Sequence, residues 1–307
     1  MATHAAATSR SAEPYRLPEL LQDIRLLDLL ELSGTTVQAS QALDISQPTV
    51  SRRYRLLAQD FGLQRDRLQR QLFRYGSTEA LRWLRLGARA HRLAAGHARV
   101  GTDPLHQPFL AGLPGLLPTP VRFRSIHTWA ALVREGVIDA ALVSRLEMQA
   151  AGSRLDRSGL QWVELGALPL GLVVPSGLRL DESGLPPVLV PQRSIAPGLH
   201  RLLLSEGLRL RAAGHSCNTA EHLVRRALEQ ELAIPTYAVT ACWGNQLEYL
   251  PFPRAITTAT GVLVPADTAT VRRFTGALEL LKEQITATGS SKELSQAKSQ
   301  PNPCSFA

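Results

Sequence analysis

The stretch GTTVQASQALDISQPTVSRRYRLLAQDFG, residues 34–62, predicts two short helices joined by a tight corner. Pro48 is tolerated only in the first turn of a helix, where its missing N–H is not needed, so the second helix must begin at about Ser46 or Gln47. From there four apolar residues recur at helical spacing and form a stripe that packs inward: Val50, Tyr54, Leu57 and Phe61. The pattern is that of a compact helical domain.

The opposite face of the second helix is polar and rich in arginine. It carries Gln47, Thr49, Ser51, Arg52, Arg53 and Arg55, which are donors and acceptors suited to base edges and phosphates. In a helix-turn-helix the N-terminal end of the second helix enters the major groove of DNA, and here that end holds Gln47, Pro48, Ser51 and Arg52. The face therefore predicts a DNA-reading helix. An ordinary three-helix core with a solvated, arginine-bearing surface is the alternative.

Charge favours DNA. Residues 46–95 contain eleven arginines and three acidic residues, a net charge of +8, which equals the net charge of the whole chain. Positive charge gathered around a candidate recognition helix is the electrostatic footprint of a phosphate-binding surface. We therefore expect a nucleic-acid partner.

Residues 24–62 resemble the winged helix-turn-helix of LysR-type transcriptional regulators. Leucines 26, 27, 29 and 30 stand for the family's apolar first helix, residues 34–43 follow its G-S-F-x-x-A-A-x-x-L run, and residues 45–52 follow V-S-Q-P-A-V-S-R, without a gap. Thr36 stands where an aromatic residue is usual, and Ser40 replaces the second alanine. The family's L-F-x-R wing motif is not cleanly present in residues 63–74.

The resemblance implies that residues 19–75 form a winged helix-turn-helix that binds double-stranded promoter or operator DNA. Gln47, Ser51 and Arg52 are then expected to read bases. Arg53 and Arg55, with the wing arginines Arg67 and Arg70, are expected to bind phosphates. The remaining predicted contacts lie at the starts of the two helices: Thr35, Thr36, Pro48 and Thr49.

Residues 78–93 predict a long helix, within a linker of residues 76–97. Its apolar stripe runs through positions 80, 81, 84, 88, 91 and 95, with arginines on the other side. In the resembling family this linker helix pairs with its copy in a second subunit, which implies a homodimer or homotetramer on a two-fold DNA site. The alternative is a helix docked on its own domain.

After residue 97 strands alternate with helices, which predicts an α/β region with a parallel sheet over residues 98–285. The expected strands are residues 98–101, 121–126, 138–143, 163–174 and 208–212, and the expected helices are residues 105–117, 129–135, 219–232 and 270–285. Gly136, Asp139 and Val143 match a G-x-x-D-x-x-I/V segment of the same family's effector-binding region. The resemblance thus implies α/β overall: a winged helix-turn-helix, a linker helix, then a two-lobed, periplasmic-binding-protein-like effector domain.

The proline-rich residues 186–191 predict the crossing between lobes. Lobe I would comprise residues 98–187 and about 255–285, and lobe II residues 188–254. A cleft between strand ends favours a small, anionic effector, because helix N-termini there offer free N–H groups. The candidate contacts are Thr102, Ser125, Thr128, Gln192, Ser194, Asn218 and Thr219, each of which is otherwise a plain helix cap.

Other classes of protein fit less well. The sequence has no run of about 20 apolar residues that would cross a bilayer, and residues 1–18 and 286–307 read as disordered tails. Three unpaired cysteines favour a reducing cytoplasm and argue against a zinc site or any other metal site.

Cys217 beside His215 leaves open an enzyme with a thiol nucleophile. A non-specific or effector-independent DNA binder and a solute-binding protein also stay open. We expect no cofactor and no membrane partner.

Overall fold

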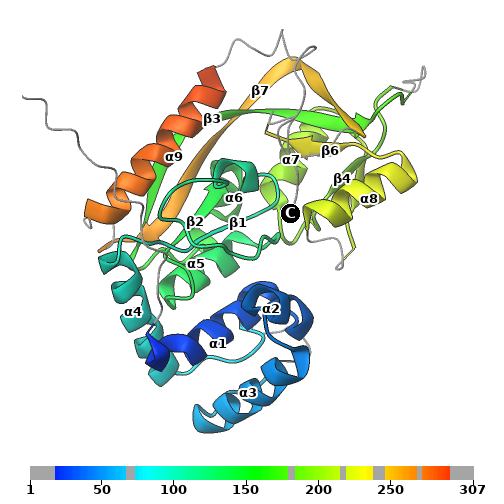
Figure 1. Cartoon of the computed structure of the whole chain (residues 1–307). Helices are drawn as coiled ribbons and strands as arrows, with labels where there is room; N and C mark the ends of the chain where they lie inside the picture. The colour runs from blue at the N-terminus through cyan, green and yellow to red at the C-terminus, as the bar shows by residue number, and fades with distance from the viewer. Residues whose placement is uncertain are drawn as a thin grey trace, which may run out of the picture.

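The computed structural model describes residues 18–66, 73–178, 184–214, 219–237, 246–267 and 272–290. A helical domain occupies the N-terminal part, and a larger α/β region follows it (Figure 1). One helix, α4 (Glu79–Ala94), connects the two. This order of parts agrees with the fold class expected from the sequence.

The helical domain begins with the short 3₁₀ turn η1 (Glu19–Leu21) and three helices, α1 (Gln22–Ser33), α2 (Thr36–Leu43) and α3 (Gln47–Asp60). Local chemistry sets their ends. The hydroxyls of Thr35 and Ser46 accept hydrogen bonds from the first turns of α2 and α3, as N-cap residues do. Gly34 ends α1 with φ +72°, a conformation that glycine adopts freely.

The inward stripe of α3 is confirmed. Val50, Tyr54 and Leu57 are buried with Leu27 and Leu30 of α1 in one hydrophobic cluster, and Phe61 packs against it half-buried. Tyr54 also stacks edge-on against Tyr75, with ring centroids 5.1 Å apart. The helical domain therefore has a core of its own.

The main sheet of the α/β region has five strands in the order β1-β2-β7-β3-β6. They are β1 (Val100–Thr102), β2 (Ala140–Ser144), β3 (Leu160–Pro175), β6 (Ile234–Thr236) and β7 (Leu247–Pro265). Only β1 and β2 are parallel. The other neighbours pair antiparallel, so the expectation of a parallel sheet is wrong for most of it.

A second, small parallel sheet joins β4 (Val188–Val190) to β5 (Leu210–Ala212). The predicted lobe boundary at residue 187 falls just before β4, yet it separates β3 from its partner β6, which pair at Gly171–Thr236. The long strands β3 and β7 pair over nearly their full length and run through both parts. The main sheet therefore takes strands from both sides of the predicted boundary.

Helices cover the sheets. They are α5 (Ile126–Arg134), α6 (Arg145–Ala151), α7 (Pro197–Ser205), α8 (Ala220–Gln230) and α9 (Arg272–Ser290). In Figure 1, α9 lies along β3, and a Cβ on Gly166 of that strand would come within 3.1 Å of Ile285 of α9. The sequence pattern missed α6 and α7.

Two predicted elements are absent. The expected helix at residues 105–117 is reduced to η2 (Gln107–Phe109) and turns. No strand forms at residues 121–125, although the backbone N–H of Arg122 donates to the carbonyl of Thr102 at 3.3 Å. The side chains of Arg122 and Arg124 donate hydrogen bonds to carbonyls at the end of α1. Among the described helices, none is both long and apolar enough to cross a membrane.

Candidate nucleic-acid interface

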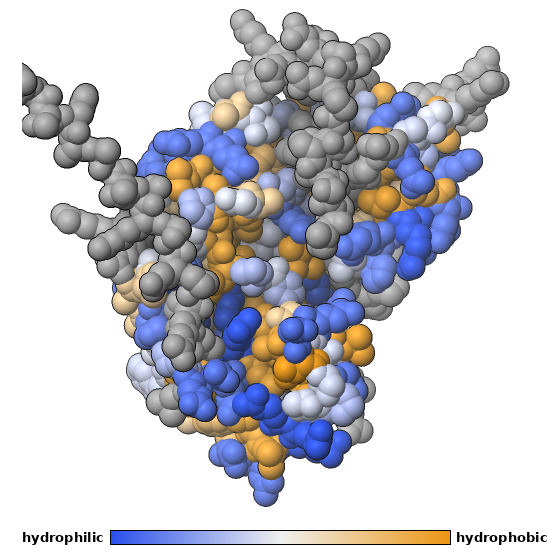
Figure 2. Space-filling view, viewed as in Figure 1, coloured by the Kyte–Doolittle hydropathy of each residue, from blue (hydrophilic) through white to orange (hydrophobic). Residues whose placement is uncertain are grey.

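Helix α3 lies at the outer edge of the helical domain, on the side away from the sheets (Figure 1). Its outward face is polar and basic. Gln47, Pro48, Arg52 and Arg55 are exposed there, and Ser51 is half-exposed. These residues recur at spacings of three and four, so their side chains share one face. Figure 2 shows hydrophilic residues interspersed with hydrophobic ones along this lower edge of the molecule, and Leu56 of α3 is 63% exposed. The structure thus brings together the predicted base-reading residues on a convex, accessible helix.

A hydrogen-bond network fixes the corner between α2 and α3. The amide nitrogen of Gln47 donates to Oγ1 of Thr36 at 3.0 Å and to Oγ of Ser51 at 3.1 Å. Ser46 and Thr49 share a bond of 2.8 Å between their hydroxyls. The predicted contacts from both helices therefore form a single polar surface, with Thr35 exposed beside it.

Arg53 is placed differently from its neighbours. Its Nη2 lies 2.8 Å from Oδ1 of Asp23 in α1, and both side chains are about half-exposed. The arginine is thus held at the flank of α3 by an ion pair within the domain. The predicted wing contacts Arg67 and Arg70 lie outside the described residues.

The base of the predicted wing is anchored on α1. The carboxylate of Glu31 accepts hydrogen bonds from the backbone N–H groups of Arg74 and Tyr75, each at 3.0 Å. The N–H of Asp66 donates to the carbonyl of Arg74 at 2.9 Å, which brings the two flanks of the segment together.

Three arginines that the charge count assigned to the phosphate surface are buried instead. Arg85, Arg89 and Arg92 of α4 point inward, and their side chains are at most 8% exposed. Arg85 pairs with Asp28 of α1 at 2.8 Å, and Arg92 pairs with Asp139 at 2.7 Å. The exposed basic surface of the described residues is therefore smaller than the sequence predicts and is concentrated on α3.

The apolar stripe predicted for α4 is divided between two faces in the single chain. Leu81 and Ala88 are buried, but Ala80, Leu84, His91 and Ala95 are exposed. The inward face of α4 is held by its arginines because both Asp28 and Asp139 lie opposite it.

Asp139 and Gly136, from the predicted G-x-x-D segment, form the seat of α4 on the α/β region. Asp139 is fully buried and accepts hydrogen bonds from Arg92 and from the backbone N–H of Arg99, the latter at 2.6 Å. Gly136 has φ +79°, and a Cβ there would lie 3.1 Å from the backbone of Arg85. The segment thus serves to dock the helix closely.

Arginines from the α/β region bind the helical domain directly. Nη1 of Arg99 donates to Asp28 at 2.9 Å, and Nη1 of Arg122 donates to the carbonyl of Ser33 at 2.9 Å. Arg124 donates to the carbonyls of Glu31 and Leu32, where the C-terminal end of the α1 dipole favours a cation. Burial lowers the pKa of Arg99 and of Arg122, and lowers that of Arg124 to about 10.

The predicted effector contacts are mostly structural in this arrangement. Thr102 is buried and donates to the carbonyl of Leu142 at 3.4 Å. Ser125 caps α5 and bonds Thr128, and Thr219 caps α8. Gln192 is half-exposed and Ser194 exposed, while Asn218, His215 and Cys217 lie outside the described residues.

A buried polar cluster at the strand ends was missed from the sequence. His106 lies within 3.1 Å of the Asp103 carboxylate and 3.4 Å from Oγ1 of Thr260, and its ring lies 4.6 Å from that of Tyr237. Burial raises the pKa of Tyr237 to about 12. His106 and Tyr237 come from distant segments, so no local pattern signals their meeting. Across the residues described, no group of three or more His, Cys, Asp or Glu side chains is arranged to hold a metal.

No protein-family model and no curated protein sequence matches this chain. Similar solved structures include a hydrogen-peroxide-bound mutant of OxyR from Corynebacterium glutamicum, with a TM-score of 0.44 and 16% identity over 90% of this chain and 96% of that one. HinK, a LysR family transcriptional regulator from Pseudomonas aeruginosa, has a TM-score of 0.43 and 16% identity over 86% and 98%. Full-length CbnR in complex with its target DNA has a TM-score of 0.44 and 14% identity over 86% and 99%.

Proposed function

We propose that this chain is a sequence-specific, DNA-binding transcriptional regulator of the LysR type, whose activity a small-molecule effector modulates. The observation that carries the proposal is the outward face of α3, where Gln47, Ser51, Arg52 and Arg55 project from a helix that is capped, anchored and free of covering elements among the described residues. Arginine and glutamine at the N-terminal end of such a helix suit the donor and acceptor pattern of the major groove.

A homodimer would present two such helices to successive turns of the duplex. Helix α4 supports a dimer, because most of the exposed side chains on its outward face are apolar or small. Trp83 and Leu84 are 62% and 38% exposed, and the other exposed positions at helical spacing are His91 and four small residues, Ala80, Gly87, Ala90 and Ala94. Small residues allow two helices to approach closely, and burial of the tryptophan would stabilise their contact.

Effector response is proposed to pass through α4. This helix is locked to α1 by the Arg85–Asp28 pair and to the α/β region by the Arg92–Asp139 pair. A ligand that alters the α/β region would therefore alter the angle of α3, provided that it binds the two arrangements with different affinity. We assign no catalytic role to the chain, and we propose a cytoplasmic location, which fits a DNA target.

The test is a selection of bound sequences from a random duplex library, followed by titration of the selected site and a scrambled duplex of equal length at several salt concentrations. We expect selective binding with a two-fold symmetric consensus, and a strong loss of affinity with salt on both duplexes. Enrichment of no sequence, with equal binding of both duplexes, would reduce the chain to a non-specific DNA binder. Absence of any binding would refute the proposal.

A further inference from the structure

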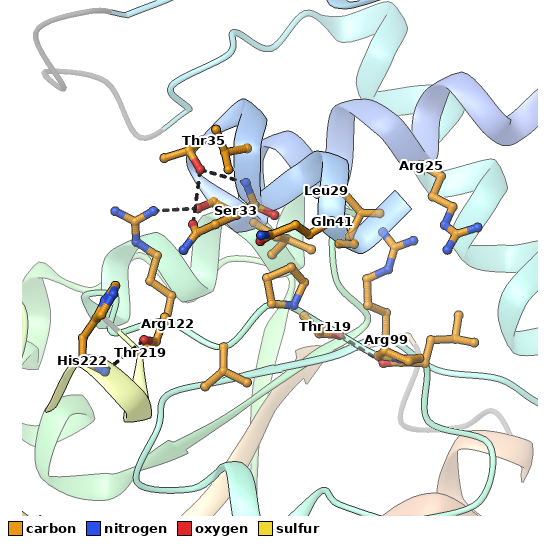
Figure 3. Close-up of a pocket in the computed structure, with 18 residues that line it drawn as sticks. Arg25, Leu29, Ser33, Thr35, Gln41, Arg99, Thr119, Arg122, Thr219 and His222 are labelled. Atoms are coloured by element: carbon orange, nitrogen blue, oxygen red, sulfur yellow. Dashed lines mark hydrogen bonds between the residues drawn. The ribbon is translucent and has the colours of Figure 1, made fainter. Parts of the chain in front are cut away.

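A cavity of about 920 Å³ lies between the helical domain and the α/β region (Figure 3). One wall comes from α1 and α2, with Leu29, Val37 and Ala42 among its residues. The opposite wall comes from the segment at residues 117–122, from Arg99 and from the start of α8. The volume lies in the range of pockets that hold small molecules.

The cavity has an apolar body with basic groups at its edge. Seven of the 18 lining residues are leucines, valines or prolines, and no acidic residue is among the lining residues. Arg25 and Arg122 stand on either side, as Figure 3 shows. Arg99 also reaches the cavity, but its Nη1 is engaged by Asp28 at 2.9 Å, so its charge is already compensated. The net electrostatic character of the lining is positive.

Polar groups that can orient a ligand also line the cavity. Gln38 and Gln41 reach it from α2, and Thr219 and His222 reach it from α8. The Ser33 hydroxyl, in the same wall, is buried and has no hydrogen-bond partner among the described residues. A buried polar atom left without a partner costs free energy that a ligand group or a water molecule can restore.

We propose that this cavity is a binding site for an amphipathic anion, a small molecule with an apolar body and one carboxylate, sulfonate or phosphate group. The apolar walls remove the body from water, and Arg25, on one side of the cavity, attracts the acidic group. The site is separate from the predicted cleft between lobes. Of the described cleft candidates, Thr219 alone lines it.

The position of the cavity gives such a ligand a mechanical effect. Its walls belong to different parts of the chain, so the site is complete only while the helical domain is docked on the α/β region. A ligand bound there stabilises the docked arrangement by its binding free energy. Thr35, a predicted DNA contact, lines the same cavity. This regulatory meaning rests on the proposed function, whereas the site itself does not.

The test uses 8-anilinonaphthalene-1-sulfonate as the probe, with the uncharged N-phenyl-1-naphthylamine as its match in shape. Fluorescence and calorimetric titrations of the full chain, without DNA, are expected to give one site that prefers the sulfonate by about tenfold. Ala42→Trp fills the cavity from an exposed position on α2 and should abolish this site. Arg25→Gln should weaken sulfonate binding about fivefold and leave the uncharged probe unaffected.

The matched control is Arg157→Gln, which removes an exposed arginine outside the cavity and should leave both titrations within about twofold of the original chain. Circular dichroism and the thermal midpoint of each variant report whether the chain remains folded. Equal affinity for the two probes, or sulfonate binding that survives Ala42→Trp, would overturn the proposal. Because no DNA is present, this outcome is distinguishable from a failure of sequence-specific DNA binding.

Discussion

Arg92 binds Asp139 through two hydrogen bonds, Nη2 to Oδ1 at 2.7 Å and Nε to Oδ2 at 3.2 Å, and neither side chain is more than 1% exposed. Arg89 lies 3.4 Å from the same carboxylate, and the N–H of Arg99 donates to it. One aspartate of the α/β region thus holds the linker helix and the first strand together. A buried charge with several donors is stable only while all its partners remain.

Asp139→Asn is therefore expected to destabilise the chain by about 3–5 kcal/mol, because two buried guanidinium groups lose their counter-charge. Chemical denaturation measures the loss. The control is Asp156→Asn, which removes a surface carboxylate that is 64% exposed and pairs with Arg134 at 3.1 Å. Because solvent screens this surface pair, Asp156→Asn should hardly change the free energy of unfolding. Equal effects of the two variants would show that the buried network contributes little.

Arg52→Ala and Arg55→Ala should separate base reading from phosphate binding. If Arg52 contacts a guanine through two hydrogen bonds, its removal costs roughly 1–3 kcal/mol on the selected site and little on a scrambled duplex. Removal of Arg55 should weaken both duplexes alike and flatten the salt dependence. Affinities measured at several salt concentrations check both results. An unchanged ratio of specific to non-specific binding in Arg52→Ala would contradict the base contact.

Leu84→Glu should shift the chain from dimer to monomer, because it places a charge in the centre of the exposed apolar face of α4. Light scattering after size-exclusion chromatography measures the mass. The matched control is Leu204→Glu on α7, where the leucine is 52% exposed and distant in sequence from α4. A dimer that persists in Leu84→Glu, or dissociates equally in Leu204→Glu, would assign the subunit contact to another surface.

Tyr237 should make stability fall at alkaline pH. Burial raises its pKa from 10.0 to about 12, so the folded chain retains a proton that the unfolded chain releases. The corresponding stability is fully present below pH 10 and is lost as the pH rises from 10 toward 12. We compare the free energy of unfolding of the unsubstituted chain with that of Tyr237→Phe at each pH. The difference between them should fall by roughly 1 kcal/mol from about pH 9 to about pH 11. A difference that stays constant over this range would mean that Tyr237 titrates normally.

The helical domain is the part that the sequence predicts best. Pro48, the caps Thr35 and Ser46, and the stripe of Val50, Tyr54 and Leu57 act within one or two helical turns. Such short-range constraints are visible in the order of residues. The candidate DNA-reading face follows from the same periodicity, because residues opposite a buried stripe must face outward.

The α/β region was predicted less well because its elements depend on partners far along the chain. Residues 121–126 alternate like a strand, yet Arg122 and Arg124 bind α1 instead. The long strand β7 pairs with β3 across a wide separation in sequence, and alternation alone does not reveal that pairing.

The sequence by itself determined where α3 begins and which polar residues it presents to solvent, because the position of a proline and helical periodicity are local. The tertiary structure alone decided which arginines remain exposed. Arg85 meets Asp28 across 57 residues, and Arg92 meets Asp139 across 47. The amino-acid sequence does not distinguish an arginine that faces solvent from one that pairs with a buried aspartate. The fold places some of these arginines beside a carboxylate, where they are paired and buried, and leaves the others in water.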